Sequence, residues 1–314
     1  MKRVLFSVLL LLGMFASLAS AQMAREDIHI EFIMHENANS GFWAVVFNGA
    51  QQACDDMGVS CNIDGPPTYD PPLHAQMIDG AVAREPDALV ISLPDVTALG
   101  PSIEAAIELG IPTFSVNSGS DDFQALGILR HVGQTEYEAG LGAGKRFKAL
   151  GGSNGLCINH QVGNVALDLR CEGFADGFEG PVEVLVTASA EFSEVASAVS
   201  SHLENNPDVD TILGAGPQAS EPTLQVLEEA GLAGDVLLGS FDLSPTLLDG
   251  AERGAVAFMI DQQQYLQGYL GIQTAVLWVQ YGLLTGNEVV LTGPGFVDGS
   301  NAAQVIALSA QGIR

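Results

Sequence analysis

The feature that most constrains the fold of this chain is a regular alternation of short β-branched runs with longer amphipathic segments. The runs have the length and composition of buried strands, and the segments between them, of about 12 to 18 residues, have helical periodicity. In the first half, the predicted strands are 28–34, 59–63, 88–93 and 112–116, and the predicted helices are 42–57, 73–84 and 96–109. Strands alternating with helices in this way form a parallel sheet that is covered on both faces.

The same alternation continues through the second half of the chain. It predicts strands at 128–132, 156–159, 182–186, 211–215, 236–240 and 255–260, and helices at 135–150, 165–178, 195–205, 222–230, 245–253 and 265–281. A length of 314 residues also suggests two domains. We therefore predict an α/β protein of two Rossmann-like lobes that face each other. Ligands of such sheets bind beyond the carboxyl ends of the strands, so the cleft between the lobes is the expected site.

The N-terminus has the pattern of an export signal. Lys2 and Arg3 precede an apolar run at 4–18 that is short for a membrane span, and small residues at 19–21 precede Gln22. The pattern predicts a signal peptide at 1–21, and therefore an exported protein. No cysteine follows the apolar run, so lipid attachment of the mature N-terminus is not indicated.

The rest of the chain is strongly acidic. Without Lys2 and Arg3, the 9 remaining basic residues stand against 38 acidic ones and give a net charge of −29. Nucleic acids and anionic lipids are bound through Lys and Arg, so neither is expected as a partner. Phosphorylated or multiply anionic ligands are disfavoured for the same reason.

Four cysteines in an exported chain suggest disulfides, for which three pairings exist. Spacing favours Cys54 with Cys61 and Cys157 with Cys171, because each pair flanks one helix–strand junction. Metal binding is the alternative, but the close spacing typical of zinc ligands is missing. We expect no metal and no cofactor.

Two predicted strands of the first half are followed by candidate ligand contacts. Phe42 and Trp43 lie after a polar loop that follows the first strand, and exposed aromatic faces suit the apolar faces of sugar rings. Both rings could instead pack in the core. Asn117 and Ser118 follow the fourth strand and offer neutral donors and acceptors, although they could also serve only a turn.

The second half supplies charged candidates at equivalent places. Arg170 lies on the helix after strand 156–159, Phe192 follows strand 182–186, Asp242 follows the next-to-last strand, and Asp261 and Gln262 follow the last one. A single Asp at a strand end is usually a cap. Several carboxylates, amides and a guanidinium around one cleft instead form a set that binds hydroxyl groups.

Motifs of enzymes are weak in this chain. Residues 151–155 match G-x-S-x-G but join a helix to a strand, the reverse of a nucleophile elbow. The glycines within 140–146 lie in a helix and lack the P-loop spacing, so we expect them to serve close helix packing. The six histidines are scattered, and only His35 and His160 are expected near the cleft.

In these residues and their order, the chain resembles the type I periplasmic solute-binding proteins of sugar ABC transporters, specifically the ribose and galactose group. The resemblance covers nearly the whole mature chain. The segments that carry it are Ser40-Gly41-Phe42-Trp43 with the following Val46-Phe47-Asn48-Gly49-Ala50, Arg170-Cys171-Glu172-Gly173-Phe174, Gly239-Ser240-Phe241-Asp242, and Ile260-Asp261-Gln262-Gln263 with Tyr265-Leu266-Gln267-Gly268-Tyr269.

The resemblance implies a three-crossing hinge between lobes formed by 27–132 plus 263–290 and by 133–262 plus 291–314. It implies a monomeric periplasmic binder, not an enzyme, that captures a monosaccharide or polyol and presents it to an ABC permease. Matched by position, Phe42 and Trp43 would stack on the sugar, while its hydroxyls would be held by Arg170, Asp242 and Asp261.

The chain departs from the family pattern at three places. Asn117 and Ser118 stand where the ribose group has Asp and Arg, Gly216 replaces an Asn, and Ser40 replaces a polar residue before the aromatic turn. These departures leave the identity of the sugar open.

Three alternatives remain at this point. An exported carbohydrate-active enzyme could use Asp242 and Asp261 as its two carboxylates. A binding protein coupled to a chemoreceptor would capture a sugar-like signal. A sugar-responsive transcription regulator shares the fold, but it would have a DNA-binding segment where this chain has an export signal.

Overall fold

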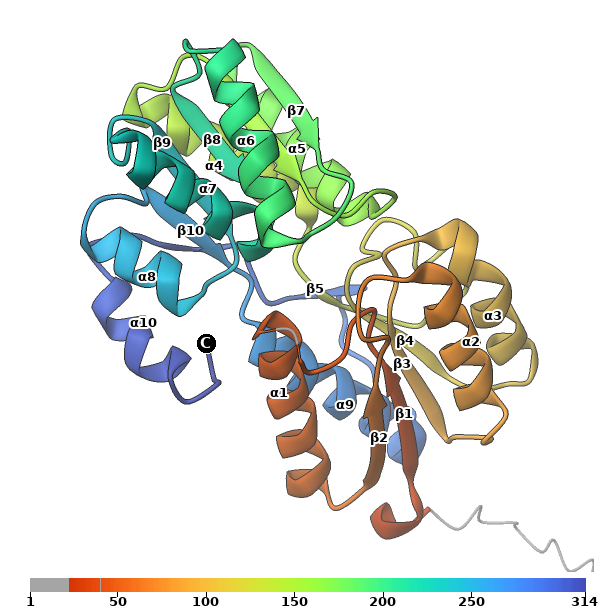
Figure 1. Cartoon of the computed structure of the whole chain (residues 1–314). Helices are drawn as coiled ribbons and strands as arrows, with labels where there is room; N and C mark the ends of the chain where they lie inside the picture. The colour runs from red at the N-terminus through yellow and green to blue at the C-terminus, as the bar shows by residue number, and fades with distance from the viewer. Residues whose placement is uncertain (1–22, 40) are drawn as a thin grey trace, which may run out of the picture.

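The computed structural model describes residues 23–39 and 41–314 and shows two α/β lobes (Figure 1). The expected signal peptide at 1–21 lies outside the described residues, as does Ser40. The N-lobe contains β1 (His29–Ile33), β2 (Ser60–Asp64), β3 (Ala88–Ser92), β4 (Thr113–Asn117), β5 (His131–Gly133), β11 (Val289–Leu291), α1 (Gly41–Met57), α2 (Pro71–Val82), α3 (Val96–Glu108) and α9 (Gln264–Tyr281). A short 3-10 helix, Arg25–Asp27, precedes β1.

The C-lobe is built in the same way. It contains β6 (Gly155–Asn159), β7 (Val182–Val186), β8 (Thr211–Gly214), β9 (Leu237–Phe241), β10 (Phe258–Asp261), β12 (Gly295–Val297), α4 (Glu136–Leu150), α5 (Val165–Phe178), α6 (Phe192–Asn205), α7 (Pro217–Ala230), α8 (Pro245–Glu252) and α10 (Ala302–Ser309). The two lobes predicted from the alternation of strands and helices are therefore confirmed.

The two sheets have equivalent strand orders. The order is β11-β5-β4-β3-β1-β2 in the N-lobe and β12-β10-β9-β8-β6-β7 in the C-lobe, so each strand has a counterpart at the same place in the other lobe. All pairs are parallel except β10 with β12. The central strands β3, β4 and β6 are buried throughout, as expected of parallel sheets covered by helices on both faces.

The chain crosses between the lobes three times. The crossings lie between β5 and α4, between β10 and α9, and between β11 and β12. Because both sheets point their carboxyl ends toward the junction of the lobes, the residues that follow the strands are brought together there (Figure 1).

Some element boundaries differ from those predicted. The strand expected at 128–132 is β5, which begins only at His131, and α6 begins at Phe192 instead of residue 195. The strands β11 and β12 were not predicted, since each has three residues and periodicity cannot identify so short a strand.

Glycines allow two pairs of helices to pack with their backbones in contact. In the C-lobe, a Cβ on Gly140 of α4 would lie 2.3 Å from the carbonyl oxygen of Arg170, and one on Gly173 of α5 would lie 2.1 Å from that of Tyr137. In the N-lobe, a Cβ on Gly49 or Gly268 would lie 2.0 Å from a carbonyl oxygen of the opposite helix. The expected packing role of the glycines in α4 is confirmed.

Each lobe contains one disulfide. Cys54 of α1 is bonded to Cys61 of β2, and Cys157 of β6 is bonded to Cys171 of α5. This is the pairing that the spacing favoured, and it rules out the metal-binding alternative for these cysteines. The second disulfide fixes α5 to the sheet one residue after Arg170.

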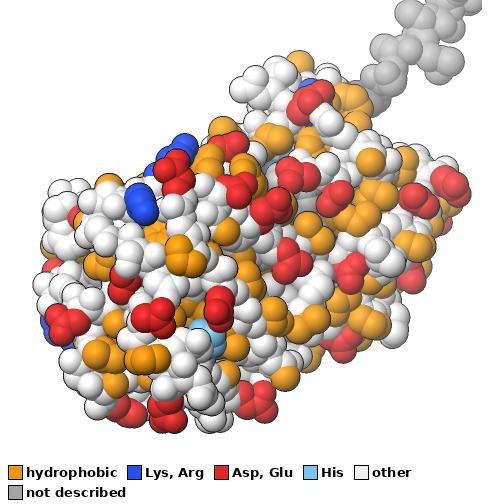
Figure 2. All heavy atoms as spheres, turned by 90° about the horizontal axis from the view of Figure 1, so that it is seen from above, with side chains coloured by type: hydrophobic (Ala, Val, Ile, Leu, Met, Phe, Trp, Pro, Cys, Tyr) orange, Lys and Arg blue, Asp and Glu red, His pale blue; other side chains and the backbone are white. Residues whose placement is uncertain are grey.

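Acidic side chains are spread over the face seen in Figure 2, whereas Lys and Arg are few. Among residues 23–39 and 41–314, no helix is both long and apolar enough to span a bilayer.

Candidate functional site

Two connected spaces lie between the lobes. The smaller one, which we call the inner pocket, has a volume of about 40 Å³. It is lined by His35, Glu36, Phe42, Trp43, Asn117, Ser118, His160, Gln161, Asn164, Leu167, Arg170, Ala215, Gly216, Pro217, Gln218, Asp242 and Gln262. The larger one, which we call the groove, has a volume of about 1190 Å³. It shares six lining residues with the inner pocket, namely Glu36, Phe42, His160, Gln161, Pro217 and Gln218.

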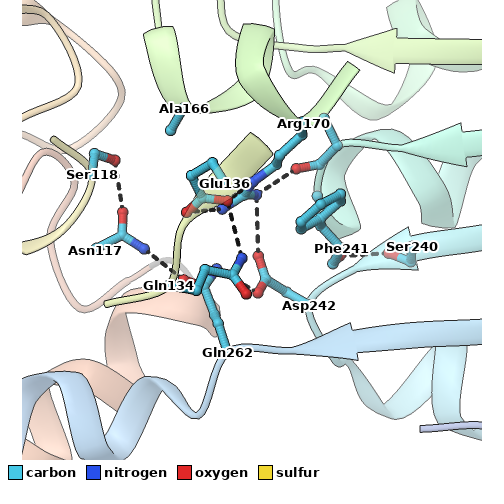
Figure 3. Close-up of polar contacts among 12 residues, drawn as sticks. Asn117, Ser118, Gln134, Glu136, Ala166, Arg170, Ser240, Phe241, Asp242 and Gln262 are labelled. Atoms are coloured by element: carbon cyan, nitrogen blue, oxygen red, sulfur yellow. Dashed lines mark hydrogen bonds and ion pairs between the residues drawn. The ribbon is translucent and has the colours of Figure 1, made fainter. Parts of the chain in front are cut away.

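Arg170 forms the centre of the C-lobe side of the inner pocket. Its Nε and Nη2 donate to the two carboxylate oxygens of Glu136 at 2.7 and 3.1 Å, and its Nη1 donates to the carbonyl oxygen of Ala215 at 2.7 Å (Figure 3). The guanidinium also lies 4.4 Å from the centre of the Phe241 ring. Because Arg170 is held on several sides, its remaining N–H groups are fixed in direction before any ligand arrives.

Asp242 is the second charged group of this side. Its Oδ2 lies 3.7 Å from Nη1 of Arg170, and its Oδ1 accepts a hydrogen bond of 2.7 Å from Gln262. Burial raises the pKa of Asp242 to about 7, although the charge of Arg170 and the hydrogen bond from Gln262 oppose this shift. Burial by itself would lower the pKa of Arg170, but the charges of Glu136 and Asp242 raise it, so the guanidinium stays charged.

On the N-lobe side of the inner pocket, the end of β4 supplies neutral groups, and Glu36 supplies a carboxyl group. Asn117 ends β4, and Ser118 donates to its Oδ1 at 2.9 Å. Asn117 occupies the place in the N-lobe that Asp242 occupies in the C-lobe, directly at the end of equivalent strands. Both residues have φ of 64°, a left-handed conformation that Asn and Asp tolerate better than most side chains. The backbone thus turns the same way in both lobes and presents an amide on one side and a carboxylate on the other.

Amide side chains of the hinge join the two sides. Asn117 donates to Oε1 of Gln262 at 3.1 Å, and Gln262 in turn donates to Asp242 (Figure 3). On the first crossing, Gln134 donates to Glu136 at 3.0 Å. A chain of hydrogen bonds therefore runs from Ser118 in the N-lobe to Asp242 in the C-lobe, and Asp242 in turn lies 3.7 Å from the guanidinium of Arg170.

His35 and His160 line the inner pocket from equivalent positions after β1 and β6, as expected. Burial lowers the pKa of His160 to about 3 and that of His35 well below its usual value, with the charge of Arg170 adding to both shifts. Both imidazoles are neutral near pH 7. Nδ1 of His35 pairs with Ser92 at 3.0 Å, whereas the buried Nδ1 of His160 has no partner among the described residues.

The three candidate aromatics occupy different environments. Trp43 is only 2% exposed and belongs to the N-lobe core, while its edge contacts the inner pocket. Phe42 is half-buried and lines both spaces. Phe192 lines the groove and is 44% exposed, so the structure places it beside the inner pocket and not in its wall.

Asp261 is the one candidate that lines neither space. Its carboxylate accepts from the backbone N–H of Gln263 at 2.7 Å and from Nε of Arg314 at 2.7 Å. The strand orients this side chain away from the inner pocket, toward the C-terminal segment that follows α10. The residue next to it, Gln262, lines the pocket instead.

Glu136 was missed by the sequence analysis. It is 2% exposed, and it is the main partner of Arg170. The rule that site residues follow strands could have found it, since it comes three residues after β5, but an acidic residue in the first turn of a helix is common.

The arrangement is suited to binding and not to an obvious covalent step. The inner pocket offers a fixed guanidinium, the carboxyl groups of Asp242 and Glu36, two neutral imidazoles, several amides and the hydroxyl of Ser118. Such a set exchanges hydrogen bonds with a ligand that carries several hydroxyl groups.

Solved structures share this architecture. A carbohydrate transporter protein from Acidothermus cellulolyticus, solved with myo-inositol, is 30% identical with a TM-score of 0.86, over 91% of this chain and 99% of that one. A periplasmic sugar-binding protein from Legionella pneumophila is 26% identical with a TM-score of 0.79, over 85% of this chain and 99% of that one.

Among curated proteins, the xylose/arabinose-binding protein of Sulfolobus acidocaldarius is 27% identical over 87% of this chain and 71% of its own length. The ribose import binding protein of Haemophilus influenzae is 24% identical over 84% of this chain and 89% of its own length. A periplasmic binding protein domain is recognised over residues 30–282, which is most of the chain. Together with the two lobes, the three crossings and the inner pocket between them, this match shows that the chain belongs to the periplasmic binding protein family.

Proposed function

We propose that this protein captures one neutral monosaccharide or cyclic polyol in the inner pocket and presents it to an ABC permease. The observation that carries the proposal is the placement of Arg170 and Asp242 opposite Asn117 and Ser118, at the carboxyl ends of equivalent strands of two lobes. The relatives named above bind sugars or a cyclitol in the same fold, which supports this ligand class.

The charges of the site favour an uncharged ligand. Arg170 already faces two carboxylates, Glu136 and Asp242, so it has no excess positive charge to offer an anion. Placing a phosphate or carboxylate beside this buried cluster would add unpaired negative charge at a high desolvation cost. Hydroxyl groups avoid this cost because they both donate and accept.

Binding requires the lobes to move. The inner pocket, at about 40 Å³, is far below the roughly 300 Å³ at which small-molecule pockets begin. The lobes contact each other directly, because Gln161 donates to Glu36 at 2.8 Å and the N–H of Val165 donates to the carbonyl oxygen of Pro94 at 3.1 Å. A ligand enters when these contacts open, and it stabilises closure only through contacts with both lobes.

The size of the expected affinity is reasonable for such a site. A micromolar dissociation constant corresponds to about 8 kcal/mol. Several hydrogen bonds to charged groups contribute about 1.5 to 3 kcal/mol each, and contact with the half-buried Phe42 adds apolar burial, before the cost of ordering the ligand is subtracted.

The proposal is tested with a thermal-shift screen followed by calorimetry. The neutral panel contains myo-inositol, D-xylose, L-arabinose, D-ribose and D-fructose, and the charged controls are ribose 5-phosphate and glucuronate. We expect a neutral compound to stabilise the protein, by about 4 kcal/mol at 1000 times its Kd, with no effect of the charged controls. Tight binding of a charged control alone, or no binding of any neutral sugar or polyol, would contradict the proposal.

The same experiment separates binding from catalysis. NMR of the recovered ligand shows an unaltered compound if the protein is a binder, and a new product if the enzyme alternative holds. Light scattering would measure the molar mass in solution and so test the expected monomeric state. Ligand uptake by cells with and without the protein would test whether it delivers the ligand to a permease.

A further inference from the structure

We propose that His160 is a ligand-binding residue, that its Nδ1 exchanges a hydrogen bond with one hydroxyl group of the ligand, and that Gly216 is glycine in order to admit the His160 ring. This inference rests on the proposed function, since it names a further contact of the same neutral, polyhydroxylated ligand.

The first observation is an unsatisfied buried atom. His160 is 5% exposed and lines the inner pocket, yet its Nδ1 has no hydrogen-bond partner among the described residues. A buried polar atom without a partner costs about 1 to 3 kcal/mol, so native proteins rarely keep one without a reason. A hydroxyl group placed in the pocket would supply the missing partner.

The second observation concerns the reason for a glycine at position 216. Its φ of 179° is extended backbone that any residue adopts, so the conformation does not require glycine. The requirement is steric, because a Cβ on Gly216 would lie 2.7 Å from Cε1 of His160. No side chain fits at position 216 while the imidazole keeps its place.

These two residues therefore act as one unit. The space beside position 216 is taken by an imidazole from the end of β6, the strand that pairs with β8. The polar group at this wall of the pocket is therefore a neutral ring. We infer that this pairing helps to set which hydroxyl arrangement the pocket accepts.

His160 differs from its counterpart in the N-lobe. His35 occupies the equivalent position, but its Nδ1 is already paired with Ser92 and its ring contacts the edge of Trp43 at 4.6 Å between centroids. His35 is thus held by its own lobe, whereas His160 keeps one nitrogen for a further partner.

The test uses His160→Ala with a matched control. His74 is equally buried and also has an unpartnered Nδ1, but it lies in α2 and does not line either space. With the panel compound that binds most tightly, we expect His160→Ala to raise Kd about 10- to 100-fold while His74→Ala changes it less than threefold. Thermal denaturation shows whether each variant is folded. A folded His160→Ala variant with unchanged affinity, or an equal loss in His74→Ala, would overturn the inference.

A second variant tests the pairing with Gly216. We expect Gly216→Ala to lower Tm in the native background, because the new methyl group displaces the imidazole, and to have little effect in the His160→Ala background. Additive losses in the double variant would refute the pairing. This cycle needs no ligand, so it remains informative if the native protein binds none of the panel, a result that would contradict the proposed function instead.

Discussion

The two lobes share one topology but contribute chemically different halves to the site. Equivalent strand ends carry Asn117 in the N-lobe and Asp242 in the C-lobe, with the same φ of 64°. In the N-lobe half, the groups at the end of β4 are an amide and a hydroxyl, and the carboxyl group of Glu36 accepts a hydrogen bond from Gln161 of the opposite lobe. The C-lobe half contains a buried guanidinium with two carboxylates.

The difference indicates that the two lobes contribute differently to ligand binding. Arg170 is fixed by contacts within its own lobe, to Glu136 and to the carbonyl oxygen of Ala215, so the C-lobe half is organised in advance. Such preorganisation lowers the cost of binding. The neutral groups at the end of β4, Asn117 and Ser118, make weaker individual contacts, which suits a surface that must close and open again. We therefore expect the C-lobe to account for most of the affinity and the N-lobe to complete closure.

The sharpest test compares Arg170→Ala with Ser118→Ala. Loss of Arg170 removes the fixed donors and leaves Glu136 and Asp242 without their cation, so we expect Kd to rise more than 100-fold. Loss of the Ser118 hydroxyl removes one neutral group, and we expect less than a tenfold rise. Calorimetry with the best neutral ligand measures both values.

Stability must be controlled in this comparison. Removing one partner of a buried ion pair typically costs about 3 to 5 kcal/mol, so Arg170→Ala should be titrated well below its Tm. The division between the lobes is disproved if the folded Arg170→Ala variant binds as tightly as the native protein, or if Ser118→Ala is the more severe change.

The disulfides offer a second comparison between the lobes. Replacing either pair by alanine should destabilise its lobe by up to about 3 kcal/mol, since both close short loops. Only Cys171 is adjacent to Arg170, so the Cys157/Cys171 double variant should also weaken ligand binding, by about tenfold. The Cys54/Cys61 double variant serves as the control, and equal affinities of the two variants would speak against a positioning role.

The pH dependence of ligand affinity should also be set by a residue of the C-lobe half, Asp242. The pKa of Asp242 is raised to about 7 by burial, against an ordinary value of 3.8. Hydroxyl groups donate to the carboxylate form, so affinity should be highest above pH 7 and fall by up to about tenfold per unit below it. Calorimetry from pH 5 to 8 measures this profile, and Asp242→Asn should flatten it.

Stability should change in the opposite direction over the same range. Between about pH 4 and 7 the folded protein keeps the proton of Asp242, whereas the unfolded chain has lost it. The folded state therefore binds more protons, and this contribution to stability decreases as pH rises and becomes constant above 7. An Asp242-dependent contribution to stability that rises with pH in this window would show that the carboxyl is ionised in the folded protein.

The sequence was sufficient to predict the architecture because the period of its apolar residues differs between strands and helices. Right-handed crossovers between alternating strands and helices predicted parallel sheets covered on both faces, and spacing favoured the observed cysteine pairing. The strands β11 and β12 could not be predicted from the sequence, since a strand of three residues is too short to show a hydrophobic periodicity. Their place in the two sheets is set by tertiary contacts.

The site was predictable to the extent that its residues follow strands. Arg170, Asp242, Gln262 and Asn117 were found in this way, and all four line the inner pocket. What the rule cannot show is the direction in which a side chain points. Successive residues of a strand face opposite ways, so Asp261 and Gln262 could not be distinguished from sequence, and the buried partner Glu136 looked like an ordinary helix-terminal acid.

The smallest expected effect is that of Asp261→Asn, compared with Asp242→Asn. Asp261 is the last residue of β10 and is held by Arg314 and by the N–H of Gln263, outside the pocket lining. We expect its replacement to change Kd less than about threefold and to lower Tm slightly, because the bond to the C-terminal segment is weakened. Asp242→Asn should raise Kd more than tenfold at pH 8. If calorimetry instead gave equal losses of affinity for the two variants, Asp261 would have to reach the ligand. That would require the second crossing to rotate when the lobes move. Asp261 would then belong with Arg170 and Asp242 to the charged half of the site.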